Sequence, residues 1–340
     1  MPAKTPPPRR ILTALACFLA AVILVSLCLG NYRLSVAQIF TLCLDTLRGR
    51  EVDAVQAQVL FQVRLPRVLT AAVAGAGLAL SGVTLQGIFR NPLVDPHVIG
   101  VTAGSAFGGT LAIFFGLGMN GLFASTIACG LATLVLVFLA SHRIMQNSLL
   151  MLILTGMILG GLFSALVSLL QYLSDAEDTL PSIVFWLMGS FASASGDKLL
   201  LLAVPVALAS AVLLGLRWRL NLLSLGEREA RALNVNIHPL RWTVIFCSGL
   251  IVACQVAVSG SIGWVGLIIP HLGRMLIGAD HQRLLPCAML LGAAYMIVVD
   301  DLARTLSQSE IPVSIITALL GAPVFAFLVY RLRRSATHHE

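Results

Sequence analysis

Uncharged runs long enough to cross a lipid bilayer recur along the whole chain, and no other feature limits the fold as strongly. A helix needs about 20 apolar residues to span the hydrocarbon core, and only helices and closed barrels satisfy their backbone hydrogen bonds there. The runs do not alternate between apolar and polar residues, which favours helices over strands. The predicted spans are residues 11–29, 68–89, 98–117, 121–141, 148–172, 199–216, two spans that divide 242–277 near Ser259-Gly260-Ser261, 284–299 and 311–330.

The amino-acid composition supports the same class of protein. Of the 340 residues, 58% are hydrophobic and only 11% are charged, and the mean hydropathy is +0.94. One water-soluble core cannot bury that much apolar surface. We therefore predict an all-α polytopic membrane protein of about ten transmembrane helices, folded as a single transmembrane domain over residues 1–340.

The distribution of basic residues predicts the orientation. An even number of spans places both termini on one side, and with the termini inside, Lys4 and most of the 22 Lys and Arg residues fall in inner segments. We therefore expect cytoplasmic N and C termini. The longer connections are then outer at 30–65 and 173–197 and inner at 217–241. The apolar piece 183–194 is too short to span, so we expect an interfacial or re-entrant helix there.

Motifs for enzymatic or ion-coupled chemistry are missing from the sequence. It has no HExxH pattern, and no Gly-Lys dipeptide of the kind that a phosphate-binding loop requires. The seven cysteines lie mostly in apolar runs, without metal-ligand spacing. Few ionisable residues fall in the middle of the predicted spans, where coupling ions need charged partners. We expect no catalytic residue, metal site or cofactor in this chain, so a partner supplies the energy. A passive channel or ion-coupled secondary transporter is the alternative, and a membrane enzyme is a third hypothesis.

The inner connection contains the signal of one short helix. Residues 224–234 read S-L-G-E-R-E-A-R-A-L-N, in which Ser224 and Glu227 have the spacing of a capping box. Glu227 near the start and Arg231 near the end also suit the helix dipole. From these residues alone, the helix is either a solvated connector or a docking surface for a soluble partner.

Four blocks of sequence resemble one family of transport proteins. The blocks are R-L-P-R-V-L-T-A-A-V-A-G-A-G-L-A-L-S-G-V-T-L-Q-G-I-F-R-N-P-L-V-D-P at 64–96, L-G-E-R-E-A-R-A-L-N-V at 225–235, G-S-I-G-W-V-G-L-I-I-P-H at 260–271, and D-D-L-A-R with E-I-P-V-S-I-I-T-A-L-L-G-A-P-V-F near the C-terminus. In this order they resemble the FecCD/BtuC-like permease family, the membrane subunits of type II ATP-binding-cassette (ABC) importers for iron-siderophores, haem or vitamin B12. With the helices between them, the blocks cover nearly the whole chain.

The resemblance implies an assembly of several subunits in the bacterial cytoplasmic (inner) membrane. It implies a second permease copy, either identical or closely related, with the translocation path between the two. Two separate ATPase subunits would bind ATP and Mg²⁺ inside the cell, and a periplasmic or lipid-anchored substrate-binding protein would dock outside. An iron-siderophore is the first expected cargo, haem and cobalamin come next, and oxyanions remain open. No nucleic acid is expected as a partner.

The resemblance also implies roles for three groups of residues: a helix that contacts the ATPase, arginines that contact the binding protein, and a cytoplasmic gate. The cytoplasmic helix that sits in a groove on the ATPase corresponds to Gly226, Glu227, Arg228, Glu229, Ala230 and Leu233. The outward arginines that receive acidic residues of the binding protein correspond to Arg64, Arg67 and Arg304, and charge complementarity would fix the docking register. Alternatively, these arginines are interfacial anchors that reach lipid headgroups.

The cytoplasmic gate of the family falls near the end of the second predicted span. The matching residues are Asn91, Pro92 and Leu93. A proline at this position can also simply end a helix and shape a turn, which is the alternative interpretation.

Overall fold

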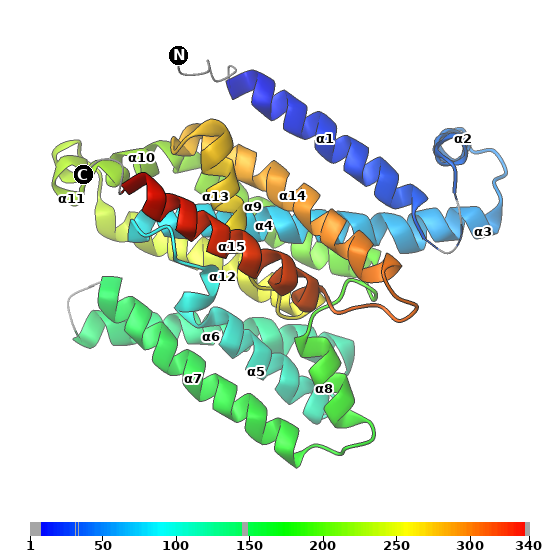
Figure 1. Ribbon diagram of the computed structural model, residues 1–340. Coiled ribbons are helices and arrows are strands. Elements are labelled where there is room, and N and C mark those ends of the chain that lie inside the picture. The colour runs from blue at the N-terminus through cyan, green and yellow to red at the C-terminus, as the bar shows by residue number, and fades with distance from the viewer. Residues whose placement is uncertain (1–7, 31, 33, 145–148, 337–340) are drawn as a thin grey trace.

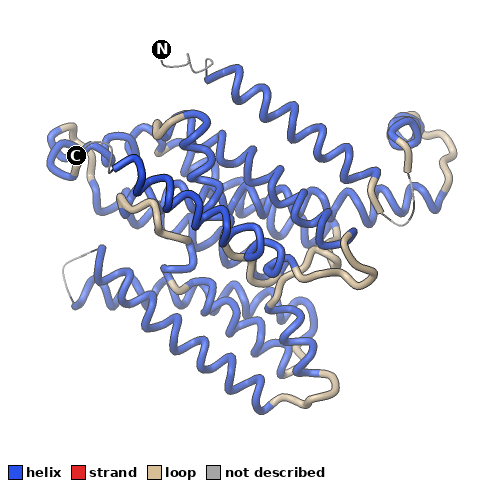
Figure 2. Tube along the Cα trace, viewed as in Figure 1, coloured by secondary structure: helices blue, strands red, loops and turns tan. Residues whose placement is uncertain are grey.

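The fold is helical throughout the part of the chain that the structure describes. The computed structural model describes residues 8–30, 32, 34–144 and 149–336, so Lys4 and both chain ends lie outside the described residues. No strand occurs in these ranges, and Figure 2 shows helices joined mostly by short loops. The helices are α1 Pro8–Cys28, α2 Val36–Leu47, α3 Ala54–Ala57, the π-helix η1 Gln58–Arg64, α4 Leu65–Phe89, the 3-10 helix η2 Pro96–Ile99, α5 Val101–Phe114, α6 Gly118–Ile144, α7 Leu149–Leu173, α8 Thr179–Leu187, α9 Gly196–Gly215, α10 Arg217–Leu225, α11 Glu227–Ala232, α12 Ile237–Ser259, α13 Val265–Ile277, α14 His281–Thr305 and α15 Val313–Ala336.

Seven helices of the described chain are long and apolar enough to cross a membrane, judged by length and composition. They are α1, the continuous helix Ala54–Phe89, α6 over Gly118–Ser141, α7, α9, α12 and α14. Three further predicted spans correspond to the shorter apolar helices α5, α13 and Val313–Phe327 of α15. Every span predicted from the uncharged runs therefore coincides with a helix, and the prediction of an all-α multi-pass membrane protein is confirmed.

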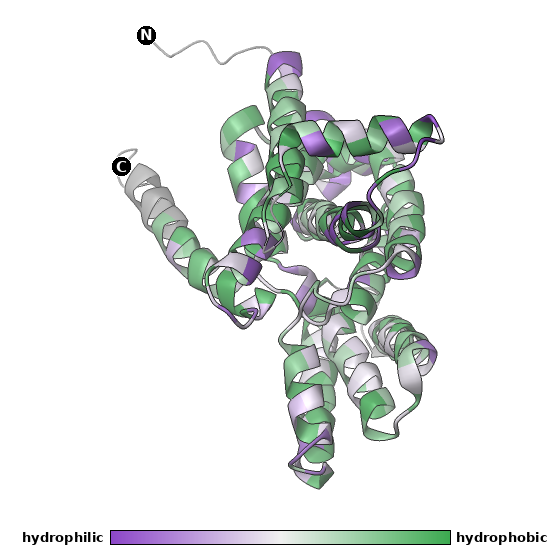
Figure 3. Ribbon diagram, turned by 90° about the vertical axis from the view of Figure 1, so that its right-hand side faces the viewer, coloured by the Kyte–Doolittle hydropathy of each residue, from purple (hydrophilic) through white to green (hydrophobic). Residues whose placement is uncertain are grey.

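The helices form a bundle with two distinct ends (Figure 1). α10 and α11 lie at one end, together with the start of α1 and the end of α15, whereas α2 and α3 lie at the other end. We call these the α11 end and the α2 end. α5, α6, α7 and α8 form a group along one side of the bundle. α2 runs across the α2 end rather than along the bundle, as Figure 3 shows with that end facing the viewer.

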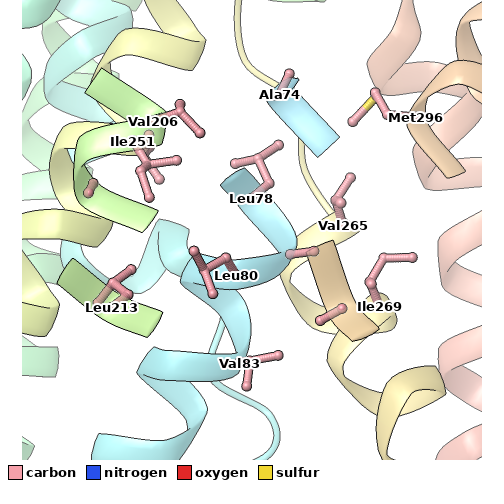
Figure 4. Packing of buried hydrophobic residues seen from close by; sticks show 14 of the residues in the cluster. Ala74, Leu78, Leu80, Val83, Val206, Leu213, Ile251, Val265, Ile269 and Met296 are labelled. Carbon is pink, nitrogen blue, oxygen red and sulfur yellow. The ribbon is translucent and has the colours of Figure 1, made fainter. Parts of the chain in front are cut away.

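The central helix of the bundle is α4. The apolar window of Ala54–Phe89 is 83% buried, against 11% for α1, so α4 has protein on nearly all sides while α1 lies at the edge. Figure 4 shows side chains of α4 surrounded by those of α9, α12, α13 and α14: Ala74, Leu78, Leu80 and Val83 lie among Val206, Leu213, Ile251, Val265, Ile269 and Met296.

Two glycines let α4 approach its neighbours to backbone contact. A Cβ added at Gly75 would overlap the carbonyl oxygen of Gly292 on α14, and one added at Gly82 would overlap the carbonyl oxygen of Gly266 on α13. Lipid gives no hydrophobic drive for helices to associate, so close van der Waals packing at small residues supplies much of it. Gly160, which has helix-packing spacing from Gly156 in the sequence, has no such neighbour within the chain.

The central helix begins earlier than the uncharged run predicted. The uncharged run begins at Val68, directly after Arg67, but the helix extends back through η1 to Ala54. Arg64 and Arg67 remain inside the helix because other parts of the chain hydrogen-bond their guanidinium groups. A span of 36 residues is about 54 Å long, more than a bilayer core requires, so this helix projects beyond the membrane at the α2 end.

Substitution of Gly82 tests the backbone contact between α4 and α13. We expect Gly82→Ala to lower the unfolding temperature of the purified protein, because overpacking typically costs about 1–3 kcal/mol and here the added methyl meets backbone. Gly215→Ala on α9 is the control, since a Cβ there meets nothing within 4 Å. Equal unfolding temperatures for the two variants would contradict the contact.

Candidate functional site

The short helix α11 at the α11 end differs in one respect from its prediction. Ser224 does not cap it: the Ser224 hydroxyl lies in the last turn of α10 and donates to the carbonyl of Leu220 at 3.0 Å. The predicted capping box is therefore wrong, because α10 extends to Leu225 and takes Ser224 into its own hydrogen-bond pattern. Gly226 is the N-cap residue instead, with a φ of 143° that favours glycine.

The predicted ATPase-contact residues divide into an exposed set and an inward set. Arg228, Glu229 and Leu233 are exposed, whereas Gly226 and Ala230 are buried against the chain itself. Exposed charges beside an exposed leucine, on a helix that projects from the bundle, are available to a soluble partner. The buried members hold α11 in place rather than offering contact.

Glu227 joins α11 to two long helices. Its carboxylate accepts a hydrogen bond from Arg241 on α12 and lies 3.7 Å from the Arg90 guanidinium and 3.5 Å from that of Arg231. The hydrogen bond from Arg241 holds the pKa of Glu227 below its usual range, and the charges of Arg241, Arg90 and Arg231 act in the same direction. Glu227 therefore stays ionised at neutral pH, and its ion pairs weaken only as the pH falls through that lowered pKa.

The Arg90 end of this network directly precedes the predicted gate. Arg90 is the C-cap of α4 in the left-handed conformation, and Asn91, Pro92 and Leu93 follow it as an exposed turn at the α11 end. The Asn91 side chain accepts a hydrogen bond from the Leu93 amide at 2.9 Å, which fixes the turn. The structure thus links the α11 helix to this turn through one ion pair.

Beyond the turn, the chain re-enters the bundle as mostly irregular backbone, interrupted by the short 3-10 helix η2. Residues 90–100 lead to α5, and residues 260–264 lead to α13. α5 and α13 have 14 and 13 residues, about 20 Å of helix, so irregular backbone completes each crossing. Such backbone is tolerated at membrane depth only where protein buries it or where it lines a cavity.

Glutamine side chains satisfy part of this irregular backbone. Gln86 on α4 donates to the carbonyls of Val94 and Gly266, each at 3.2 Å, and so joins the segment 90–100 to the first turn of α13. Gln255 on α12 donates to the Gly260 carbonyl at 2.9 Å. The packing of Pro96 against Gly266 brings the segments into direct contact.

A cavity of about 430 Å³ lies where the two re-entering segments meet α7, α8 and α15. Asp95 accepts hydrogen bonds from both the amide and the Nδ1 of His97, and the opposite edge of the imidazole faces Gly263. The His97 side chain is 34% exposed, into this cavity. The other polar lining groups are Gln171, Ser261 and Ser314.

The end of α8 forms one wall of this cavity and is attached to the start of α15. The carbonyl of Met188 accepts from the Ser314 amide at 3.2 Å, and that of Gly189 accepts from the Val313 amide at 3.0 Å. These bonds pair the unsatisfied carbonyls after α8 with the unsatisfied amides that begin α15. The predicted re-entrant piece 183–194 therefore contains a helix, but the helix is shifted toward the N-terminus, at Thr179–Leu187.

The three arginines predicted to face a binding protein all lie at the α2 end, but they are engaged within the chain. Arg64 is 5% exposed and donates to the carbonyls of Leu27 and Tyr32. Arg304 binds Asp301 and donates to the carbonyls of Ser26 and Leu29. The two side chains thus cap the C-terminal end of α1, where cations suit both the free carbonyls and the helix dipole.

Arg67 is held by two carboxylates. Its guanidinium donates twice to Asp300, both at 2.9 Å, and also to Glu310 at 2.6 Å. Arg67 is 9% exposed and Asp300 is 1% exposed, so the pair is buried between α4 and α14. No free outward cation is present at Arg64 or Arg67 in this conformation, and their docking role stays a prediction.

Sequence reasoning missed several residues of these sites. It did not single out Arg90 and Arg241, the partners of Glu227, or the cavity histidine His97. A basic residue after a span is expected at any inner helix end, so Arg90 and Arg241 carry no separate signal. The Asp-Pro-His sequence at 95–97 was a usable signal, since an ionisable pair next to a proline inside a membrane protein marks irregular backbone with charge.

The chain is similar to a family of transport proteins over nearly its whole length. The model of the FecCD transport family matches residues 18–331. The molybdate import system permease protein MolB of Haemophilus influenzae is 66% identical over 325 residues, 96% of each chain. The hemin transport system permease protein HmuU of Yersinia pestis is 38% identical, covering 92% of this chain and 94% of its own. A solved inward-facing ABC transporter, described as of metal-chelate type, is 64% identical with a TM-score of 0.87 and covers 95% of this chain and 99% of its own.

The chain belongs to the FecCD transport family. It is a multi-pass membrane protein and a permease subunit of an ABC importer, in which hydrolysis of ATP is the task of a separate subunit. The family resemblance found in the four sequence blocks is confirmed.

Substitution of Arg67 tests the buried ion pair. We expect Arg67→Gln to destabilise the protein by about 3–5 kcal/mol, because it leaves the Asp300 carboxylate buried without a cation. Arg50→Gln is the control: Arg50 pairs with Asp45 on the surface, where an ion pair contributes about 0–1 kcal/mol. Thermal unfolding in detergent measures both.

A second substitution separates charge from packing. Adding Asp300→Asn to Arg67→Gln is expected to restore part of the lost stability, because the uncompensated charge is gone. If Arg67→Gln unfolds at the same temperature as Arg50→Gln, the ion pair does not have the structural role assigned to it.

Proposed function

We propose that this chain is the permease of an ATP-driven importer for a tetrahedral oxyanion, with molybdate as the first candidate. The observation that carries the proposal is the 66% identity to MolB over 96% of both chains. An iron chelate, the first cargo expected from the family resemblance, ranks second: the haemin permease HmuU is 38% identical, and the description of the 64% identical solved transporter as of metal-chelate type names neither the metal nor the chelate.

The chemistry of the cavity supports an oxyanion. Hydroxyls of Ser261 and Ser314, the amide of Gln171 and the imidazole of His97 can each donate a hydrogen bond into it. Asp95 accepts the hydrogen bond from Nδ1 of His97, so the Nε2 edge of the imidazole points away from Asp95. No Lys or Arg lines this cavity within the described chain. A transport path requires such weak, distributed contacts, because an anion held by a full cationic site would not leave.

The partners follow from the surfaces that one chain leaves open. We propose a second copy of the permease, two ATPase subunits at the α11 end and a substrate-binding protein at the α2 end. α7 is apolar and only 17% of its spanning window is buried, so lipid or a second copy covers the rest. The α11 end would face the cytoplasm of a bacterial cell, in agreement with the basic residues there.

The coupling path in this proposal runs from α11 to the gate. Arg228, Glu229 and Leu233 contact the ATPase, and closure of the paired ATPases moves α11. Glu227 then transmits the movement through Arg90 to the turn at 91–93, which acts as the cytoplasmic gate. The bundle is thereby biased between two conformations, as expected for a switch driven by a local contact.

The outer arginines enter the proposal in a modified form. An acidic side chain of the binding protein would have to compete with Asp301 for Arg304, or with Glu310 for Arg67. Arg304 and Glu310 both line a surface cavity of about 1100 Å³ at the α2 end, which makes this exchange accessible from outside. Arg64 is proposed to support this surface by holding the end of α1.

Two substitutions in α11 separate docking from coupling. We expect Glu229→Arg, on the exposed face, to weaken assembly with the ATPase about tenfold, because charge reversal at an interface opposes the partner's charge. Glu227→Gln should retain assembly but lower ATP-driven uptake, since it removes the charge that binds Arg90 and Arg241. Pull-down with the ATPase and uptake into proteoliposomes measure the two effects. If Glu227→Gln loses assembly and Glu229→Arg does not, Glu227 is the docking residue and Glu229 is not.

Uptake of molybdate by the reconstituted importer tests the cargo. We expect ATP-dependent uptake by the wild type, and a reduction of about tenfold in His97→Ala, which removes a hydrogen-bond donor to an anion. His238→Ala is the control, because His238 is exposed in the first turn of α12, whereas the cavity residue Ser261 follows the other end of that helix. Uptake of haemin but not molybdate would replace the oxyanion with an iron chelate. Uptake without ATP would favour the passive channel.

A further inference from the structure

Lys198 is a buried cation without an anionic partner. It lies in the first turn of α9 at the α2 end and is 7% exposed. Its Nζ donates to the Ser193 hydroxyl at 2.7 Å and lies 5.9 Å from the ring centre of Phe123. No carboxylate in the described chain lies within ion-pair distance of it.

The surroundings of Lys198 favour an added negative charge. Burial disfavours an ammonium ion unless an anion or several acceptors compensate it. One hydroxyl and one aromatic face satisfy only part of its three donors. Its place in the first turn of α9 adds the positive end of the helix dipole, which attracts anions and repels cations.

Lys198 opens into a cavity of about 560 Å³ between α6, α8 and α9. The walls are mainly apolar, with Met119, Leu122, Phe123, Phe185 and Trp186 among the lining residues. The polar lining residues are Lys198 and four serines, Ser182, Ser190, Ser193 and Ser259, and the hydroxyls of Ser182 and Ser259 donate to carbonyls of their own helices. The cavity is therefore amphipathic, with one cationic end and an otherwise hydrophobic interior.

The position of this cavity matches the interface of the bilayer. α6 and α9 both begin at the α2 end, beside α8, so Lys198 lies near the level at which these helices leave the hydrocarbon core. Exposed aromatic and long apolar side chains, here Phe185 and Met119, are typical of that level. An occupant with a negative head and an apolar tail satisfies both parts of the cavity.

We propose that this cavity is a binding site for an anionic phospholipid, with its phosphate on Lys198 and the start of an acyl chain between Phe123 and Phe185. The phosphate supplies the acceptors that the Lys198 ammonium lacks. The chain covers apolar walls that water would otherwise meet.

The proposed lipid site lies on the side of α8 opposite the cavity that contains His97. Phe185 and Trp186 of α8 face the lipid cavity, whereas Val184 and Leu187 face the cavity that contains His97. Trp186 also packs so closely on Gly109 of α5 that a Cβ there would overlap the indole ring. A bound lipid would thus support α8 from the side opposite the proposed path.

Lipid-dependent stability of the assembled importer tests the site. We expect phosphatidylglycerol to raise the unfolding temperature of the detergent-purified wild type more than phosphatidylcholine does. Lys198→Met should lose this difference, and its apparent affinity for phosphatidylglycerol should fall about tenfold, since a hydrogen bond to a charged group is lost. Arg50→Gln, which removes an exposed cation at the same end, should retain the difference.

Three outcomes would overturn the proposal. The first is an equal response of wild type and Lys198→Met to phosphatidylglycerol. The second is protection by inorganic phosphate as strong as that by the lipid, which would make the site one for a small anion. If Lys198→Met does not fold, Phe185→Ser provides the test, because it keeps the cation and removes an apolar wall. An unchanged preference for phosphatidylglycerol in Phe185→Ser is the third.

Discussion

The contact between Gly82 and Gly266 is the point on which the interior of this permease depends. It brings α13 against α4 at backbone distance, and Pro96 packs directly on Gly266. Gln86, one turn further along α4, then hydrogen-bonds Val94 in the segment 90–100 and Gly266 in the first turn of α13. Irregular backbone can exist at this depth only because these contacts exclude lipid and satisfy its carbonyls.

The charged residues at the two ends of the bundle have different tasks. At the α2 end, Arg64, Arg67 and Arg304 donate hydrogen bonds to carbonyls and carboxylates of the chain, so they fix α1, α4 and α14 to one another. At the α11 end, Glu227 forms ion pairs with three arginines, while Arg228 and Glu229 stay exposed. The three arginines at the α2 end are therefore engaged within the chain, whereas Arg228 and Glu229 at the α11 end are available to a partner.

Two cavities flank α8, and their chemistry differs. The cavity with His97 presents neutral donors and one Asp-His pair, whereas the cavity with Lys198 presents a single cation in apolar surroundings. α8 is short, packs on α5 through Trp186 and is attached to the start of α15 by backbone hydrogen bonds, so it can respond to occupants of both cavities. Cargo and lipid, as proposed, would thus act on the same wall of the path.

The sequence by itself determined the helices, the membrane class and the family, because each rests on local runs of residues: uncharged spans, their order and the four blocks. It could not determine that α4 is central and α1 lies at the edge, since a span that is apolar all round has no period that distinguishes a buried side from a lipid-facing one. It also predicted outward arginines at 64 and 67 and a Ser224 cap. Only the tertiary structure shows that these groups are engaged within the chain, because their partners belong to the preceding helix or lie far away in the sequence, 37 residues for Leu27 with Arg64 and 233 for Asp300 with Arg67. The pairing of Glu227 with Arg90, and of His97 with the loop at Gly263, likewise exists only once the helices pack.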